Sequence, residues 1–131
     1  MKAIIFLALI ALSLCGPRET IVACAEEKIG TPYEKLDCSG LCRLCYKRIG
    51  KEVSSVAHYI FDHGKKVNSK AELKPGDIVG FNNHDGKPQP GHVGIYIGGD
   101  RYIHSPGRGK KITYGYLSSN KNYYGARNYI D

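Results

Sequence analysis

Apolar residues in the first half of the chain recur with the spacing of amphipathic helices. Over residues 17–29 they alternate with charged residues, which predicts a helix with a proline in its first turn and Gly30 beyond its end. Asp37 is a suitable cap for a second helix over residues 38–49, whose apolar stripe would face the core. We expect a third, shorter helical segment over residues 54–63.

The pattern changes to that of β-strands after a turn at residues 73–77. Apolar and β-branched runs separated by glycines and polar loops predict strands at residues 78–81, 92–97 and 101–104, near 111–114 and near 126–130. Helices followed by strands indicate an α+β fold, with N-terminal helices packed on one side of a C-terminal antiparallel sheet.

The expected hairpin between the second and third strands has a testable register. His92 and Gly94 point to one face of the first strand, because side chains alternate along a strand. A three-residue loop would pair Ile97 with Arg101 and set His104 opposite Gly94, diagonally beside His92. A two-residue loop alone would turn His104 to the other face. We therefore expect the longer loop or a bulge.

The N-terminus has the composition of an export signal. Lys2 supplies a positive charge, and residues 3–15 form an uncharged run rich in Leu, Ile and Ala that is too short to span a bilayer. A glycine and a proline then break the run. We expect a signal peptide over residues 1–16, one mature domain over residues 17–131, and a secreted or cell-envelope location without stable membrane association after cleavage.

Composition narrows the class of partner. A chain of 131 residues with 42% hydrophobic residues suits one globular domain and not a disordered chain. Nineteen Lys and Arg residues against 12 acidic ones give a net charge of +7, which favours anionic partners. The basic residues are scattered, and no basic helix or aromatic nucleic-acid motif appears, so we expect no nucleic-acid partner.

The five cysteines leave two structural alternatives. Cys15 falls in the expected signal peptide. Cys38, Cys42 and Cys45 share one helical face at spacings that suit neither bridging among themselves nor a zinc site, which lacks a second ligand pair. Cys42 and Cys45 are expected to be small buried residues, or one of them bonds to Cys24 if the two helices pack together. Their C-x-x-C spacing lies inside the helix, which disfavours a redox role.

Three residues have the types and settings that a thiol peptidase needs. Cys38 begins a helix, where backbone amides and the macrodipole favour a thiolate. His92 lies at the start of a later strand and is placed to take the thiol proton, while His104 ends the adjoining strand and is placed to orient His92. Taken singly, a buried cysteine or a hairpin histidine is more often structural, but together they favour an enzyme. The remaining histidines lack such a setting and are expected in loops or at the surface: His58, His63 and His84.

Five blocks follow one another along the chain: Ile29-Gly30-Thr31-Pro32-Tyr33, Asp37-Cys38-Ser39-Gly40-Leu41, Leu73-Lys74-Pro75-Gly76-Asp77, Gly91-His92-Val93-Gly94-Ile95-Tyr96-Ile97-Gly98 and Tyr102-Ile103-His104-Ser105. In content and order these blocks resemble the NlpC-type cell-wall cysteine peptidases. The resemblance covers essentially the whole expected mature chain. It implies a permuted papain-like fold and hydrolysis of peptide bonds in bacterial peptidoglycan stem peptides, between D-γ-glutamyl and a diamino acid.

The resemblance also implies roles for individual residues. Cys38 would be the nucleophile, His92 the base and His104 the third, polar member of the site. A second set matches positions that shape the site and hold the amino end of the stem peptide: Tyr33, Asp37 and Ser39. From its charge and position, Arg108 is a further candidate for binding stem carboxylates.

One departure and several alternatives stand beside this interpretation. Only residues 34–36 separate Tyr33 from Asp37, where family members carry a longer glycine-rich loop, which puts one wall of the groove in question. An amidase or an acyl transferase could use the same thiol, and a non-catalytic wall-binding domain is the alternative from another class. We expect no cofactor and no metal, and the sequence leaves the oligomeric state open.

Overall fold

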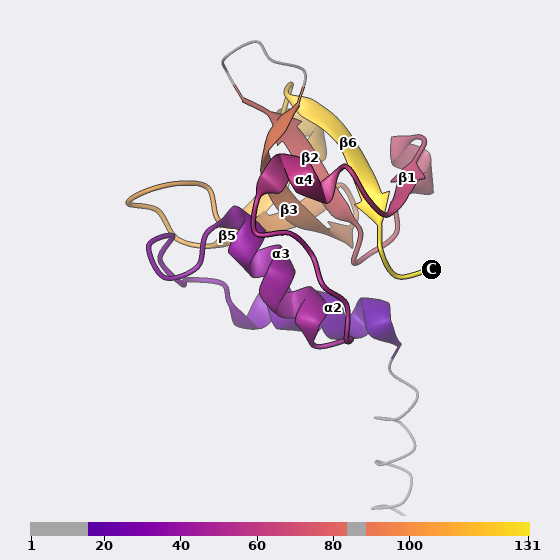
Figure 1. The fold of residues 1–131 in the computed structure, drawn as a ribbon. Helices are drawn as coiled ribbons and strands as arrows, with labels where there is room; N and C mark the ends of the chain where they lie inside the picture. Colours follow the sequence, from indigo (N-terminus) through magenta and orange to yellow (C-terminus); the bar gives the residue numbers. More distant parts are fainter. Residues whose placement is uncertain (1–15, 84–88) are drawn as a thin grey trace, which may run out of the picture.

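A computed structural model describes residues 16–83 and 89–131, which form helices packed beside an antiparallel sheet (Figure 1). The predicted signal peptide, apart from Gly16, lies outside the described residues, as does His84. The helices are α2 (Pro17–Glu27), α3 (Cys38–Lys47) and α4 (Ala57–Ile60), with 3-10 turns η1 (Lys70–Glu72) and η2 (Leu117–Ser119). The strands are β1 (Lys65–Val67), β2 (Ile78–Asn82), β3 (Pro90–Gly98), β4 (Arg101–His104), β5 (Thr113–Tyr116) and β6 (Tyr123–Asn128). The predicted α+β class is confirmed.

Helices α2 and α3 lie side by side and begin where the sequence predicts (Figure 1). The side chain of Asp37 caps α3 by accepting a hydrogen bond from the backbone of Gly40 at 2.8 Å. A disulfide between Cys24 and Cys45 joins the two helices, with 5.5 Å between the Cα atoms. This confirms one of the two predicted pairings. Cys42 is buried and free, in agreement with the expectation that it is a small buried residue.

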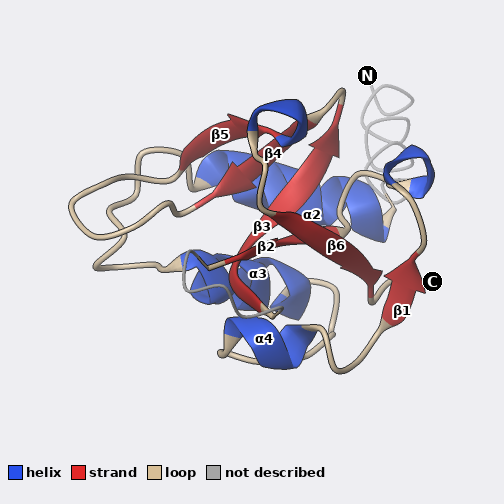
Figure 2. Cartoon of the chain, turned by 90° about the horizontal axis from the view of Figure 1, so that it is seen from above, coloured by secondary structure: helices blue, strands red, loops and turns tan. Residues whose placement is uncertain are grey.

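The six strands form one sheet in the order β1-β6-β2-β3-β4-β5, and each pair of neighbouring strands is antiparallel. The last strand of the chain therefore lies between β1 and β2, as Figure 2 shows. Helix α3 packs against β3, and α4 packs against the same strand. Strand β1 was not predicted, and β5 and β6 are displaced by two to three residues from their expected positions.

The two faces of the sheet carry separate clusters of buried residues. On the helix side, strand residues such as Val93 and Ile103 join the buried faces of the helices. The other face carries a smaller cluster made of Val79, Phe81, Tyr102, Leu117 and Ala126. None of the helices in residues 16–83 and 89–131 is long and apolar enough to cross a membrane.

The predicted turn before β2 connects the sheet to α2. Gly76 adopts a φ of 99°, a region that favours glycine. The carboxylate of Asp77 is buried, accepts a bond from the backbone of Lys74 at 3.0 Å and pairs with Arg18 of α2 at 2.9 Å. Arg18 also donates to the carbonyl of Pro75 at 2.9 Å. A partly buried ion pair therefore links the turn to α2.

The β3–β4 hairpin confirms the predicted bulge and corrects one predicted pair. Gly98, not Ile97, pairs with Arg101 across a two-residue turn whose residues both have positive φ. That turn matches the twist of paired strands, and Ile97 is taken up as the extra residue of the bulge. The bulge restores the register, so His104 stays on the same face as His92.

Candidate active site

The start of α3 presents Cys38 close to the protein surface. The side chain of Cys38 is 8% exposed, whereas Cys42, one turn further along α3, is fully buried. Because Cys38 is the first residue of the helix, its backbone N–H is among those without an intrahelical partner. The thiol therefore lies in a setting where a reacting group can reach it and where unpaired amides are available.

His92 and His104 form a hydrogen-bonded pair on neighbouring strands. Nε2 of His92 lies 2.7 Å from Nδ1 of His104. Gly94 leaves the space between the two strands, since a Cβ atom there would lie 2.9 Å from the carbonyl oxygen of Ile103 and 3.2 Å from the Cβ of His104. The rings rest on aromatic neighbours, with Phe81 beside His92. This geometry agrees with the diagonal arrangement expected from the sequence.

The thiol of Cys38 contacts the strand that carries His92. The backbone amide of Val93, the residue directly after His92, lies close enough to the sulfur to oppose the rise in the pKa of the thiol. Helix α3 packs along β3, and this contact is where the tip of the helix meets the strand. The nucleophile candidate and the histidine pair, which come from sequence positions more than 50 residues apart, therefore lie at the same end of the sheet.

Burial controls the charge state of this group. It raises the pKa of the Cys38 thiol, although backbone amides of Val93 and Ser39 act in the opposite direction. Burial also lowers the pKa of His92 to about 4. The pKa of His104 is lowered to about 4 by burial and by the neighbouring charge of His92. At neutral pH the resting site thus holds a thiol and two neutral imidazoles, rather than the thiolate that the helix terminus alone would favour.

A pocket of about 620 Å³ opens beside Cys38 and contains three of the four predicted substrate-binding residues. Tyr33, Asp37 and Arg108 line it. The pKa of Tyr33 is raised by its partial burial and by the charges of Cys38 and Asp37. Ser39 lies beneath the surface instead, only 4% exposed.

The short segment between Tyr33 and Asp37 is braced by a distant part of the chain. The backbone of Tyr33 donates to the carbonyl of Lys110 at 3.0 Å, and the backbone of Gly109 donates to the carboxylate of Glu34 at 3.2 Å. Residues 108–110 thus provide the wall that the missing glycine-rich loop left in question. No pattern in the sequence predicts this role of Glu34.

Comparison with known proteins assigns the chain to a family. The family model described as the NlpC/P60 family matches residues 27–129, well over half of the chain. The chain belongs to the NlpC/P60 family. The resemblance expected from the five sequence blocks is therefore confirmed.

Two curated relatives and one solved structure show the extent of the similarity. The gamma-DL-glutamyl hydrolase of Bacillus subtilis (strain 168) is 36% identical over 107 residues, 75% of this chain and 25% of the relative. The gamma-D-glutamyl-L-lysine dipeptidyl-peptidase of the same strain is 33% identical over 104 residues, 74% of this chain and 35% of the relative. A crystal structure of an NlpC/P60 family protein from Bacillus cereus has a TM-score of 0.79 and 27% identity, covering 87% of this chain and 40% of that one. The chain thus spans about a quarter to a third of these curated relatives.

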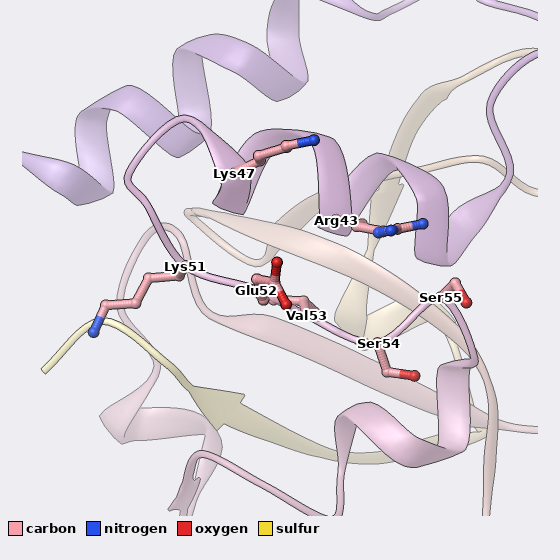
Figure 3. A pocket seen from close by; sticks show the side chains of 7 residues that line it. All are labelled: Arg43, Lys47, Lys51, Glu52, Val53, Ser54 and Ser55. Carbon is pink, nitrogen blue, oxygen red and sulfur yellow. The ribbon is translucent and has the colours of Figure 1, made fainter.

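A second pocket in this NlpC/P60 chain lies on the outer side of α3. It has a volume of about 460 Å³ and lies between α3 and residues 51–55. Figure 3 shows Arg43 and Lys47 extending from α3 above that segment, while the ammonium group of Lys51 points away from them. The carboxylate of Glu52 lies between the two elements (Figure 3). This pocket shares no lining residue with the groove beside Cys38.

The described part of the chain offers no alternative site built on a metal. No group of three or more His, Cys, Asp or Glu side chains within residues 16–83 and 89–131 is arranged to hold a metal ion.

Proposed function

We propose that this protein is a secreted cysteine endopeptidase that hydrolyses bacterial peptidoglycan stem peptides at the bond between D-γ-glutamyl and a diamino acid. The observation that carries this proposal is the meeting of Cys38 with β3 beside His92, whose ring is hydrogen bonded to His104 at 2.7 Å. A nucleophile, a base and an orienting group are the parts that thiol-dependent acyl transfer requires.

The histidine pair has one productive tautomer. If Nε2 of His92 donates its proton to Nδ1 of His104, then Nδ1 of His92 is left with a free lone pair. That nitrogen can accept the proton of the Cys38 thiol. His104 thus sets which nitrogen of His92 acts as the base. The opposite tautomer would leave His92 without a free lone pair for the thiol.

The reaction then follows in two steps. The Cys38 sulfur transfers its proton to His92 and attacks the scissile carbonyl carbon, while the backbone N–H of Cys38 donates to the developing oxyanion. The C–N bond breaks as His92 returns the proton to the leaving amine, which leaves a thioester on Cys38. Water, deprotonated by His92, attacks this thioester, and the released thiolate recovers its proton to restore the resting site.

The charge state of the resting site suits this sequence of proton transfers. A neutral thiol beside a neutral imidazole keeps the base available at neutral and mildly acidic pH, because the pKa of His92 is about 4. The thiolate forms only as the substrate approaches, when the substrate displaces water and the oxyanion gains its donor. Proton transfer and attack are therefore coupled.

The groove residues fit a stem peptide, which carries both amino and carboxylate groups. One carboxylate oxygen of Asp37 accepts the cap bond from Gly40, and the other is available to an ammonium group. Arg108 lies in the same pocket and suits a carboxylate. The relative named gamma-D-glutamyl-L-lysine dipeptidyl-peptidase supports the choice of bond.

Two features support export. Residues 1–16 have the pattern of a signal peptide. The Cys24–Cys45 disulfide suits an oxidising compartment, since structural disulfides are rare where thiols are kept reduced.

The test is fragment analysis of purified peptidoglycan digested with the mature protein, by mass spectrometry. The endopeptidase proposal predicts fragments that end in D-γ-glutamate and new amino termini at the diamino acid. Intact stems released from the glycan would instead indicate an amidase. The Cys38→Ala protein is the matched control and should release no fragments. Equal digestion by this variant would contradict the thiol mechanism.

A further inference from the structure

Two buried hydroxyl groups accompany the residues of the proposed site. The buried polar side chains of the described chain are Ser39, Asp77 and Ser105. Asp77 belongs to the ion pair that joins the turn before β2 to α2. Ser39 directly follows Cys38, and Ser105 directly follows His104. Because Asp77 has its own structural partner, the two serines are the members of this set whose placement next to the site needs an explanation.

Ser105 joins the strand of His104 to the turn that precedes Cys38. Its Oγ donates to the carbonyl oxygen of Leu36 at 2.7 Å, across a separation of 69 residues. Leu36 is two residues before Cys38, and its own backbone N–H donates to the carbonyl of Pro32 at 3.2 Å. The bond thus reaches from the end of β4 to the residue before the helix cap.

Because the Ser105 side chain is buried, its hydroxyl group needs this hydrogen-bond partner. The side chain is fully buried, where a hydroxyl without a partner is unfavourable. A distance of 2.7 Å is the usual optimum for an O–H···O bond. If packing alone mattered at this position, an alanine would fill nearly the same space without a polar group to satisfy.

Most other contacts between α3 and the sheet are less directional; the hydrogen bond from Tyr46 to the carbonyl of Gly76 lies at the end of the helix opposite Cys38. Helix α3 packs on the sheet largely through apolar side chains such as Leu41 and Val93. Such contacts hold the elements together but fix their relative position only loosely, because hydrophobic attraction has no preferred direction. His104 is held in the sheet by β3 and β5, and Cys38 belongs to α3. A directional link between these two parts must therefore come from hydrogen bonds.

Backbone pairing holds the beginning of the turn that precedes Cys38. Thr31 accepts a bond from the backbone of Ile112 at 2.9 Å, and Pro32 forms an isolated bridge with Lys111. These contacts place the beginning of the turn against residues 111–112. The Ser105 bond fixes the end of the turn, next to the helix, so the two sets of contacts define its position.

We propose that Ser105 is a positioning residue that sets the separation of the Cys38 thiol from the His92–His104 pair. The proposal rests on the proposed thiol-peptidase function. Loss of the hydroxyl leaves the carbonyl of Leu36 without this partner and lets the turn before Cys38 shift. Displacements of about 1 Å between reacting groups lower rates by about 100-fold, so a shift of a few tenths of an ångström suffices for about a tenfold loss.

The decisive measurement compares Ser105→Ala with Tyr46→Phe. Tyr46 is also buried and donates its hydroxyl to a backbone carbonyl, that of Gly76. Tyr46→Phe therefore also removes one buried hydrogen bond, but not the bond that joins Ser105 to the turn before Cys38. Ser105→Ala is expected to lower kcat by about tenfold or more with KM within about twofold, while Tyr46→Phe leaves both within about twofold of the parent. Equal losses in the two variants, or a Ser105→Ala protein as active as the parent, would overturn the proposal.

A second readout does not need the natural substrate. The rate of Cys38 alkylation by iodoacetamide, followed by mass spectrometry, is expected to fall in Ser105→Ala and its pH dependence to move to higher pH, because the imidazole no longer assists the thiol. Ser105→Cys keeps the shape of the side chain and a weak donor, so its rate of Cys38 alkylation is expected to lie between those of the parent and Ser105→Ala. If circular dichroism shows that Ser105→Ala does not fold, Ser105→Cys replaces it in the comparison. A parent protein that labels rapidly but digests no peptidoglycan would contradict the proposed function and leave this test of Ser105 intact. A Ser105→Ala protein with the parent's labelling rate and pH dependence would contradict the positioning role.

Discussion

The two ends of α3 show how one helical stripe of cysteines is put to different uses. At the first residue, Cys38 is partly accessible and meets β3 beside the histidine pair. At the other end, Cys45 is fully buried and bonded to Cys24 of α2. Between them Cys42 is a buried free thiol whose pKa is raised well above its ordinary value by burial. The comparison teaches that cysteines of one helical stripe occupy different settings according to their distance from the helix tip.

The largest expected contrast is between Cys38 and Cys42, the two free thiols of residues 16–83 and 89–131. In the native protein, iodoacetamide should alkylate Cys38 at least about 1,000-fold faster than Cys42, since a fully buried thiol reacts only after local opening. Peptide mapping after timed quenching measures both rates. In denaturant the two rates should converge, which controls for local sequence. Comparable alkylation rates in the native protein would show that the two positions on α3 do not differ in the reactivity of their thiols.

Loss of the disulfide at the end of α3 should lower the stability of the protein and leave its activity largely unchanged. Replacing both Cys24 and Cys45 by alanine is expected to lower the free energy of unfolding by about 3 kcal/mol, since the link restricts the unfolded chain. Urea denaturation measures this loss, and kcat/KM of the folded variant should stay within about threefold of the parent.

Cys42→Ala is the matched control for the disulfide variant. It removes one buried sulfur from the same stripe and should cost about 1 kcal/mol, without a change in kcat/KM. A disulfide variant that is stable but inactive would mean that the link positions Cys38, and the division between the two ends of α3 would then be wrong.

The last prediction concerns the pH dependence of activity at the Cys38 end of α3. Neutral His92 is the proposed base, so kcat/KM should fall only as the pH drops through about 4, the lowered pKa of that residue. At pH 5 a histidine with an ordinary pKa would be about 3% neutral, so the buried base retains an advantage of about 30-fold. A pH–rate profile with a soluble stem peptide, checked by circular dichroism for folding, measures the midpoint. An acidic limb centred near pH 6.5 would contradict the neutral resting site.

Much of this architecture follows from local signals in the sequence. The cap residue Asp37 and the apolar period of α3 predicted that helix from its first residue, and alternation along β3 predicted the face that His92 shares with His104. These features depend on neighbours a few residues apart. A short window of sequence is therefore sufficient to predict them.

The features that sequence reasoning missed depend on contacts between distant segments. Strand β1 is short, with two exposed lysines among its three residues, and it forms because β6 pairs with it. The choice of Cys45 over Cys42 as partner of Cys24 depends on how α2 and α3 pack. Ser105 gave no chemical signal, since its importance appears only when Leu36 is placed opposite it.

Position 94 offers a way to tune the enzyme. A single hydrogen atom in place of a side chain decides how near the two imidazoles can come, because the neighbouring strand already occupies the space that a methyl group would need. Any larger residue must push β3 and β4 apart at the point where the ring nitrogens meet. A graded series of substitutions there would act as a molecular spacer, so that reactivity could be adjusted without altering any group that takes part in the reaction.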